Sequence, residues 1–208
     1  MSAPAQDLRG EIIDSLISQI RANLKGDTAP VERFVHQFLA DVATEFLLEP
    51  TSEDLYGAVV SMWSHARQRE KSGPKIRVYN PTQETHGWHS THTVVEIVND
   101  DMPFIVDSVV NALNRDQLMV HLLIHPIILV VRDGDRVLED VLEPGSEAGA
   151  TESMGHVEIS QRGSADALKA LHAQIAQVLD DVRAAVEDWP AMRERVSELV
   201  DELRAADP

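Results

Sequence analysis

The chain has 208 residues, of which 43% are hydrophobic and 25% are charged, so it can bury a sizeable core. Its 35 acidic residues against 18 basic ones give a formal net charge of −17. A surface with this charge repels phosphate backbones and anionic lipid headgroups, which argues against nucleic acid and membrane as partners.

The sequence contains no cysteine, which excludes disulfides, thiolate metal sites and cysteine nucleophiles. The first residues lack the cationic start and unbroken apolar stretch of a secretory signal. The most apolar run, Leu118 to Val131, is interrupted by His121, His125 and Pro126 and is shorter than the roughly 20 residues needed to span a bilayer. We therefore expect a soluble, cytoplasmic protein.

Residues 5 to 70 have helical spacing and predict a three-helix unit, within a first domain of residues 1–72. The apolar residues of the first helix are Leu8, Ile12, Ile13, Leu16, Ile17, Ile20 and Leu24. After a break at Gly26 to Pro30, the same period predicts a second helix that continues to Pro50. Thr51 or Ser52 is expected to cap a third helix.

A connection rich in charge, glycine and proline follows at residues 69–90, with a short strand predicted at Lys75 to Tyr79. Runs of β-branched residues then predict strands at Thr93 to Val98 and Met119 to Val131. Pro126 is expected to divide the second run, because proline cannot donate to a sheet. A helical pattern from Ile105 lies between the two runs, which indicates a βαβ-like crossover.

The junction between the first of these strands and the helix is the candidate binding site of the sequence. It consists of Asn99, Asp100, Asp101, Met102, Pro103 and Phe104. In the structural interpretation one carboxylate caps the first helical turn, where a proline is tolerated because its missing N–H would be unpaired anyway. In the functional interpretation the helix amides hold the carboxylate of an amino-acid effector while the aspartates grip its amino group.

Asp133-Gly134 separates two apolar runs and predicts a tight hairpin with positive backbone angles, joining strands near 127–132 and 136–142. The glycine- and acid-rich residues 142–155 are expected to form a long surface loop. One more strand is predicted at His156 to Ser160.

From Ser164, the expected cap, the helical period returns. One helix is predicted to end at Trp189-Pro190 and a final helix to follow it. The apolar residues of these helices are Leu168, Leu171, Ile175, Val178, Val182, Met192, Val196, Leu199, Val200 and Leu203. Such a stripe packs either in the core of its own chain or at a subunit interface.

Several histidines have spacings that are compatible with a metal site. His86, His89 and His92 form H-x2-H-x2-H, but no carboxylate pattern completes a recognisable site, and we expect a polar loop without metal. His121 and His125 are expected to be hydrogen-bonded sheet residues on one face.

Two segments, THTVVEIVNDDMPFIVDSVVNAL and MVHLLIHPIILVVRDGD, resemble the N-terminal region of the large bacterial NAD-specific glutamate dehydrogenases, most specifically over residues 90–135. The resemblance implies an α+β fold with an ACT-like (ferredoxin-like) antiparallel sheet and helices. It places this sheet domain at residues 73–163 and a helical extension, the second ACT helix plus a terminal helix, at 164–208.

The sequence departs from the ACT pattern at two points. Ligand-binding ACT domains commonly carry glycine after the proline of the D-x-P turn, whereas Phe104 follows Pro103 here. The usual final strand after the second helix is missing, and the strand at 156–160 is expected to fill the sheet instead.

The dinucleotide fingerprint G-x-G-x-x-G does not occur in the 208 residues, so no catalytic residue and no cofactor are assigned to this chain. The resemblance implies that NAD binds elsewhere in the parent enzyme. It implies a non-catalytic regulatory or oligomerisation region, partnered by the rest of the enzyme and by further copies. The alternative is an amino-acid-sensing ACT-type module.

Overall fold

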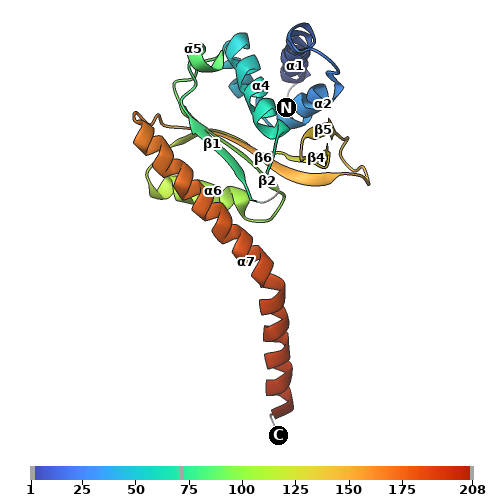
Figure 1. The fold of residues 1–208 in the computed structure, drawn as a ribbon, viewed down its shortest axis with the longest axis vertical. Helices are drawn as coiled ribbons and strands as arrows, with labels where there is room; N and C mark the ends of the chain where they lie inside the picture. Colours follow the sequence, from blue (N-terminus) through green and yellow to red (C-terminus); the bar gives the residue numbers. More distant parts are fainter. Residues whose placement is uncertain (1–2, 71–72, 207–208) are drawn as a thin grey trace.

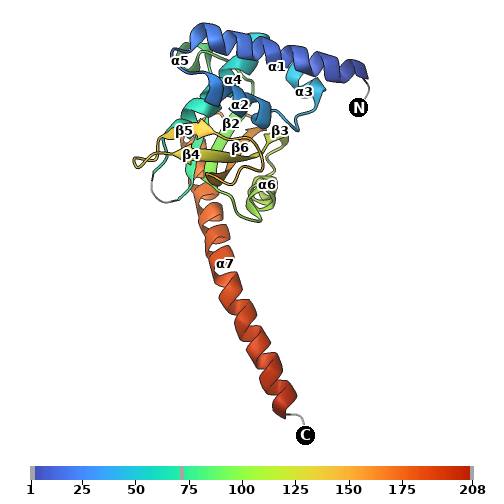
Figure 2. The same ribbon diagram turned by 90° about the vertical axis from the view of Figure 1, so that its right-hand side faces the viewer.

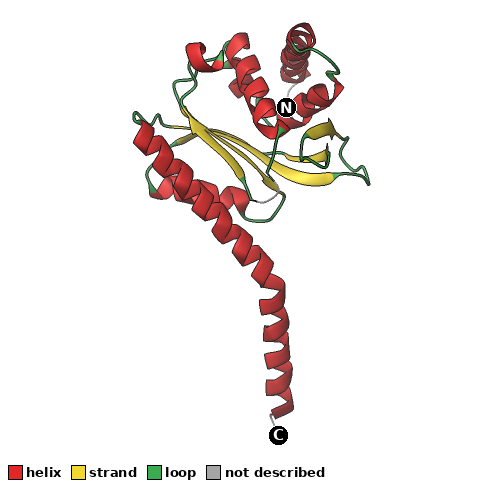
Figure 3. Ribbon diagram, viewed as in Figure 1, coloured by secondary structure: helices red, strands yellow, loops and turns green. Residues whose placement is uncertain are grey.

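The computed structural model describes residues 3–70 and 73–206. Its elements are α1 (Ala3–Asn23), α2 (Ala29–Phe38), α3 (Thr44–Leu48), α4 (Ser52–Arg67), β1 (Lys75–Tyr79), α5 (Gln83–His86), β2 (Thr93–Asp100), α6 (Ile105–Arg115), β3 (Val120–Ile124), β4 (Ile127–Arg132), β5 (Leu138–Val141), β6 (Ala150–Ile159) and α7 (Ala165–Ala206). Helices lie on both sides of one sheet (Figure 1, Figure 3), which confirms the α+β class.

β6 is the central strand of a six-stranded sheet with the order β1-β2-β6-β4-β5, in which β3 also pairs with β6. Residues 152–159 of this strand pair antiparallel with β2, while its other edge pairs with β4 at residues 150–153 and with β3 at 156–159. Because β2 and β3 are both antiparallel to β6, they run parallel to each other. α6 therefore makes the predicted crossover between them.

Each face of the sheet has its own helical layer, as Figure 2 shows with α1 to α4 on one side and α6 and α7 on the other. Val98, Ile128 and Met154 lie in a core shared with α1, α2 and α4. Val95 and Ile97, which point to the opposite face, lie in a core shared with α6 and α7.

The second predicted helix is divided, so the N-terminal segment has four helices and the three-helix prediction is wrong. α2 ends at Phe38 and α3 begins at Thr44. The Arg9 guanidinium of α1 donates to the carbonyls of Leu39, Ala40 and Val42. It thereby supplies donors to carbonyl groups in the turn where the helix ends.

The hairpin between β4 and β5 is confirmed, but its turn differs from the expected one. The positive φ of 64° falls on Arg136 and not on Asp133-Gly134. The Asp133 carboxylate accepts from the backbone N–H groups of Asp135 and Val137, at 2.9 and 2.8 Å. The side chain of Asp133 therefore organises a longer turn than the dipeptide suggests.

The predicted loop at 142–155 is too long, because β6 already begins at Ala150. Residues 150–155 form a strand despite their glycine and acidic residues because β4 pairs with residues 150–153 and β2 pairs with residues 152–155. The strand at 156–160 was expected to replace the missing final strand of the ACT pattern. It belongs instead to β6 at the centre of the sheet, and β1 occupies the edge beside β2.

α7 is one helix of 42 residues and does not end at Trp189-Pro190, so the predicted pair of helices is wrong. Proline removes one backbone hydrogen bond, but the apolar period keeps the same phase before and after it. Figure 1 shows that α7 changes direction along its length and that its C-terminal half leaves the sheet. Leu203, assigned to the final helix, has a side chain outside the described part of the chain.

Several local predictions are confirmed. Thr51 caps α4 by accepting from the Asp54 N–H at 3.1 Å, and Ser164 accepts from the Ala167 N–H at 3.2 Å. β1 has the predicted bounds, and Pro126 separates β3 from β4.

Gly57 of α4 offers a test of how this helix docks on the segment after α5. A Cβ atom at Gly57 would lie 2.2 Å from Trp88 Cβ and 2.6 Å from Trp88 Cγ, and Trp88 is almost fully buried. We expect Gly57→Ala to lower the free energy of unfolding by about 1–3 kcal/mol, because the helix or the indole must shift. Urea unfolding followed by tryptophan fluorescence measures the change.

Gly10→Ala in α1 is the matched control, because no atom lies within 4 Å of a Cβ added there. Alanine at that position should raise helix stability by up to about 1 kcal/mol. Equal effects of the two substitutions would contradict the close packing of α4 on Trp88.

Candidate functional site

The structure places the predicted corner at the end of β2 but assigns its residues differently. Asn99 and Asp100 are still part of β2, and α6 begins only at Ile105. The residue before α6 is Phe104, without a side-chain capping hydrogen bond. The prediction that an aspartate caps this helix, with Pro103 in its first turn, is therefore wrong.

Asp100 is held by arginines instead. Arg69 Nη1 donates to Asp100 Oδ1 at 2.7 Å and to Glu152 Oε1 of β6 at 3.0 Å. Arg132 of β4 completes the group with hydrogen bonds of 2.8 and 2.7 Å to the two oxygens of Glu152. Burial opposes ionisation of Asp100, but the hydrogen bond and charge of Arg69 outweigh it and hold the pKa of Asp100 below its usual value.

Arg183 of α7 contacts the same corner from the other side. Its Nη2 atom donates to Asn99 Oδ1 at 2.9 Å and lies 3.5 Å from Asp100 Oδ2. Asn99 and Asp100 therefore already have protein partners. They connect α7 to the end of β2 and, through Asp100, to Arg69 and Glu152.

The rest of the corner surrounds a shallow hollow of about 280 Å³, bordered by residues 101–107 with His125 and Ile127. Asp101 is exposed, and its backbone N–H donates to Thr151 O at 3.2 Å. Met102 packs partly into the core below, next to Pro103. Phe104 has a φ of 72°, the left-handed region that favours glycine, and its side chain is 65% exposed. Phe104 thus has a backbone conformation typical of glycine and borders the hollow with an exposed side chain.

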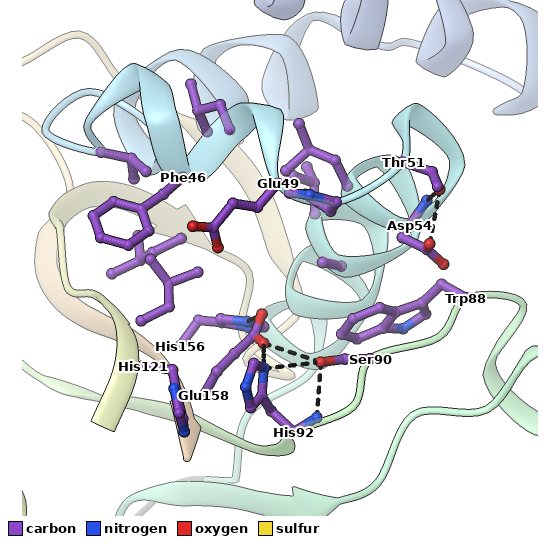
Figure 4. Close-up of a pocket in the computed structure, with 18 of the residues that line it drawn as sticks. Phe46, Glu49, Thr51, Asp54, Trp88, Ser90, His92, His121, His156 and Glu158 are labelled. Atoms are coloured by element: carbon purple, nitrogen blue, oxygen red, sulfur yellow. Dashed lines mark hydrogen bonds and ion pairs between the residues drawn. The ribbon is translucent and has the colours of Figure 1, made fainter. Parts of the chain in front are cut away.

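A second cavity, of about 360 Å³, lies between the helical layer of α3 and α4 and the other face of the sheet (Figure 4). One wall is apolar and the other is polar. Its apolar lining includes Phe38, Leu39, Val42, Phe46, Leu47, Leu55, Leu122 and Ile124. Its polar lining includes Glu49, Asp54, His89, Ser90, His92, His121, His156 and Glu158.

The polar wall is built around Glu158 of β6. Oε2 of Glu158 accepts from His92 Nδ1 at 2.9 Å and from Ser90 Oγ at 3.0 Å. Its other oxygen, Oε1, lies 3.4 Å from Nε2 of the buried His156. The ring of His121 stacks on that of His92 with centroids 4.2 Å apart. Figure 4 shows these side chains meeting at one end of the cavity.

Behind this wall, Glu96 of β2 is fully buried and paired. It accepts from Arg77 Nε at 2.9 Å and from Tyr79 Oη at 3.0 Å, and it lies 3.9 Å from His156 Nδ1. Burial disfavours the charged form of each group, but the contacts with His156 outweigh burial and lower the pKa of Glu96 and of Glu158 to about 2. Burial lowers the pKa of His156, yet the two carboxylates outweigh it and raise that pKa to about 9.

Some polar groups around the cavity are not satisfied by the described residues. Trp88 Nε1 and His156 Nδ1 are buried and have no hydrogen-bond partner there. Neither a hydrogen bond nor an ion pair reaches Glu49 from the part of the chain that the structure describes, and Figure 4 shows its carboxylate in the space that Phe46, His156 and Glu158 border.

The histidines of H-x2-H-x2-H do not converge. His86 accepts from the Thr82 N–H and its ring contacts Tyr79, whereas His92 pairs with Glu158. Over residues 3–70 and 73–206, no three His, Asp or Glu side chains lie close enough to hold a metal ion. His121 and His125 contact Ser160 and Ser153 at 3.4 and 2.6 Å, which confirms that they are hydrogen-bonded. The prediction that both lie in a strand is wrong for His125, because β3 ends at Ile124 before Pro126.

Sequence reasoning located the corner but missed this cavity. Its polar wall joins Ser90 and His92 to His156 and Glu158, and the β2–β6 pairing brings these distant positions together. The only local signal was the concentration of polar side chains directly before the strand at Thr93.

The fold and both sites define an ACT-like α+β domain, with helices α6 and α7 packed on an antiparallel sheet. A family model described as "Glutamate dehydrogenase, ACT1 domain" matches residues 34–175. The chain belongs to this family, and it corresponds to an N-terminal part of NAD-specific glutamate dehydrogenases.

Two curated relatives, both named NAD-specific glutamate dehydrogenase, are similar to the chain. The Halomonas elongata protein is 35% identical over 206 residues, which cover 98% of this chain and 13% of the relative. The Pseudomonas aeruginosa protein is 36% identical over 179 residues, which cover 84% of this chain and 11% of the relative. The chain thus spans only about an eighth of the length of these relatives.

The cluster of Glu96, His156 and Glu158 predicts a stability optimum at mildly acidic pH. Carboxyl pKa values lowered to about 2 give stability that is present above about 4.5 and lost as the pH falls. The raised pKa of His156 gives stability that is present below about 6.5 and lost as the pH rises toward 9. Between about pH 6.5 and pH 9 we expect the free energy of unfolding to fall by up to ~1 kcal/mol per pH unit.

Urea unfolding at several pH values measures this fall, and His156→Gln should abolish its alkaline part. His92→Gln, which changes the more exposed partner of Glu158, should retain the alkaline fall. An unchanged alkaline slope in His156→Gln would contradict the assignment.

Proposed function

We propose that this chain is a non-catalytic region of an NAD-dependent glutamate dehydrogenase that supports subunit assembly and transmits regulatory signals. The parent reaction converts glutamate, NAD and water to 2-oxoglutarate, ammonia and NADH in the cytoplasm. The NAD and glutamate sites would lie in the rest of the enzyme, since the chain lacks the G-x-G-x-x-G fingerprint. None of the helices in the described ranges has the length and apolarity to cross a membrane.

The observation that carries the assembly role is the exposed apolar stripe of α7. Its first half is buried on the sheet through Leu171, Ile175 and Leu179. Its second half keeps apolar residues that no described residue covers, with exposed fractions of 39–60%: Trp189, Met192, Val196, Leu199 and Val200. Soluble proteins rarely leave such a stripe uncovered, so it supports an interface.

The spacing of this stripe supports pairing with another helix. Trp189, Met192, Val196 and Leu199 alternate in steps of three and four, the heptad pattern of a two-stranded coiled coil. In a parallel pair, Asp188 of one copy would lie beside Arg193 of the other at the flanking positions. This charge complementarity supports a second copy of the chain as the partner.

The contacts of Arg183 support the regulatory role. Because Arg183 binds Asn99 and Asp100, a movement of α7 on the sheet would break hydrogen bonds at the corner. Asp100 in turn binds Arg69, which reaches Glu152 in the central strand. One connected group of charges therefore joins the projecting helix to the middle of the sheet.

An amino-acid sensor at the corner is the alternative function. The hollow beside residues 101–107 and the exposed Asp101 favour it. The arginine-bound oxygens of Asn99 and Asp100 argue against it, because they are no longer available to an effector, although the buried Asn99 Nδ2 has no hydrogen-bond partner among the described residues.

Val196→Glu tests the assembly role. We expect the unaltered chain to have a mass in solution approaching twice its monomer mass of 23.1 kDa, measured by light scattering. Val196→Glu should shift it to the monomer, because a buried unpaired charge in the interface is unfavourable. Ser197→Glu, the same change one position along and off the stripe, is the matched control and should leave the dimer intact.

An unaltered chain that stays monomeric would contradict the assembly role, as would equal effects of the two substitutions. Circular dichroism should show unchanged helix content in both variants, because both positions are exposed.

Titration calorimetry with a panel of amino acids separates the two functions. For an assembly region we expect no saturable heat that depends on Asp101. A sensor at the corner would give saturable heat that is lost in Asp101→Ala, and that result would favour the alternative.

A further inference from the structure

The cavity between α3, α4 and the sheet lies on the opposite face from α6 and α7, and the proposed assembly role does not use it. We propose that this cavity binds a small, uncharged and largely apolar molecule that carries a hydrogen-bond acceptor such as a carbonyl oxygen. The inference does not depend on the proposed function, and it concerns a different site from the corner.

The indole N–H of Trp88 is the group that requires an acceptor. Trp88 lines the cavity and is only 2% exposed, and its Nε1 atom has no hydrogen-bond partner within the described ranges. Buried donors in native proteins are nearly always paired. An indole nitrogen can only donate, so the partner that is missing from the described chain is an acceptor.

Neighbouring residues hold this indole in place. The backbone of α4 approaches it so closely that a Cβ atom added at Gly57 would lie 2.2 Å from Trp88 Cβ and 3.0 Å from Trp88 Cδ1. The ring of Tyr79 packs edge-on against the indole with centroids 6.3 Å apart, and the His156 ring lies 6.5 Å from it. The donor is therefore already oriented before a ligand arrives, which lowers the cost of binding.

The charges of the lining exclude an anion as the acceptor. Asp54 and Glu158 both line the cavity, whereas none of its lining residues in the described chain is a lysine or an arginine. An anionic ligand would meet the repulsion of these carboxylates. A cation that can only donate would leave the Trp88 N–H unpaired. The ligand that fits both conditions is neutral.

The apolar side of the lining selects the body of the ligand. Its side chains come from α2, α3, α4 and β3 and include Phe38, Leu47, Leu55, Leu122 and Ile124. A cavity of about 360 Å³ has the size and mixed lining of small-molecule sites. A single water molecule could pair the Trp88 N–H, but it would leave these apolar side chains uncovered.

Titration calorimetry of the 208-residue chain tests the proposal with three probes of nearly the same shape. Benzamide is neutral and offers a carbonyl acceptor, benzoate is an anion, and benzamidinium is a cation that can only donate. We expect saturable 1:1 binding of benzamide with a Kd of about 1 mM or tighter. Benzoate and benzamidinium should each bind at least about tenfold more weakly, because the first meets the carboxylates and the second leaves Trp88 unpaired.

Trp88→Phe removes the donor and keeps an aromatic ring. It should weaken benzamide binding by about two- to tenfold, the loss of one hydrogen bond, and reduce the preference for benzamide over benzamidinium by the same factor. A packing defect alone would weaken both probes alike. Trp63→Phe is the matched control and should bind benzamide like the unaltered chain, because Trp63 packs on Phe34 and is not among the residues that line the cavity.

The indole resonances of the unaltered chain give a test that does not depend on the folding of Trp88→Phe. The sequence has three tryptophans, so spectra of Trp63→Phe and Trp189→Phe leave the third signal assigned to Trp88. In proton–nitrogen correlation spectra, benzamide should shift the Trp88 indole N–H downfield and by more than the other two, which do not line the cavity.

Absence of saturable benzamide binding would overturn the proposal. Equal binding of benzoate or benzamidinium would overturn it as well, as would an unmoved Trp88 resonance or an unchanged probe preference in Trp88→Phe. None of these results would change the solution mass of the chain, so failure here and failure of the assembly role are distinguishable.

Discussion

The pairing of β6 with strands on both of its edges is the constraint on which the rest of the structure depends. This strand carries Glu152, His156 and Glu158 on one face, and all three point into the helical layer. A buried charge is costly unless it is paired, so each position requires a partner from another element. Arg69 and Arg132 pair with Glu152, whereas Ser90 and His92 complete Glu158. The register of one strand thus fixes both the charged group near the corner and the polar wall of the cavity.

The corner and the cavity lie at opposite ends of β6. At one end of β6, Glu152 leads through Arg69 and Asp100 to Arg183, and so to the helix that projects from the sheet. At the other end, Glu158 borders a cavity under the helical layer. Both groups lie on one hydrogen-bonded strand, so β6 is the element that joins the lining of the cavity to the contacts of α7.

The parts of the fold that the sequence predicts are those set by neighbouring residues. Thr51 and Ser164 cap helices whose first turns are adjacent, and Pro126 divides β3 from β4 because of its own chemistry. The errors arise where residues distant in the sequence determine the bounds of a helix or strand. Arg9 binds the carbonyl groups after α2 from another helix, and pairing with β4 and β2 extends β6 into a glycine-rich segment. The cavity was missed for the same reason, since its polar wall exists only once β2 and β6 are paired.

Phe104 shows how the corner can keep an ACT-like backbone without the residue that usually allows it. A left-handed conformation costs a non-glycine residue about 1–2 kcal/mol, and a side chain that is 65% exposed recovers little of this by burial within the described chain. The tie of Asn99 and Asp100 to Arg183 on one side, and the packing of Ile105 on the other, hold the turn in place. A bulky side chain at this point blocks the close approach of a ligand to the backbone that glycine would permit. The same residue that adopts a glycine-like conformation therefore closes the backbone of the turn to a ligand, while Asn99 and Asp100 beside it hold α7.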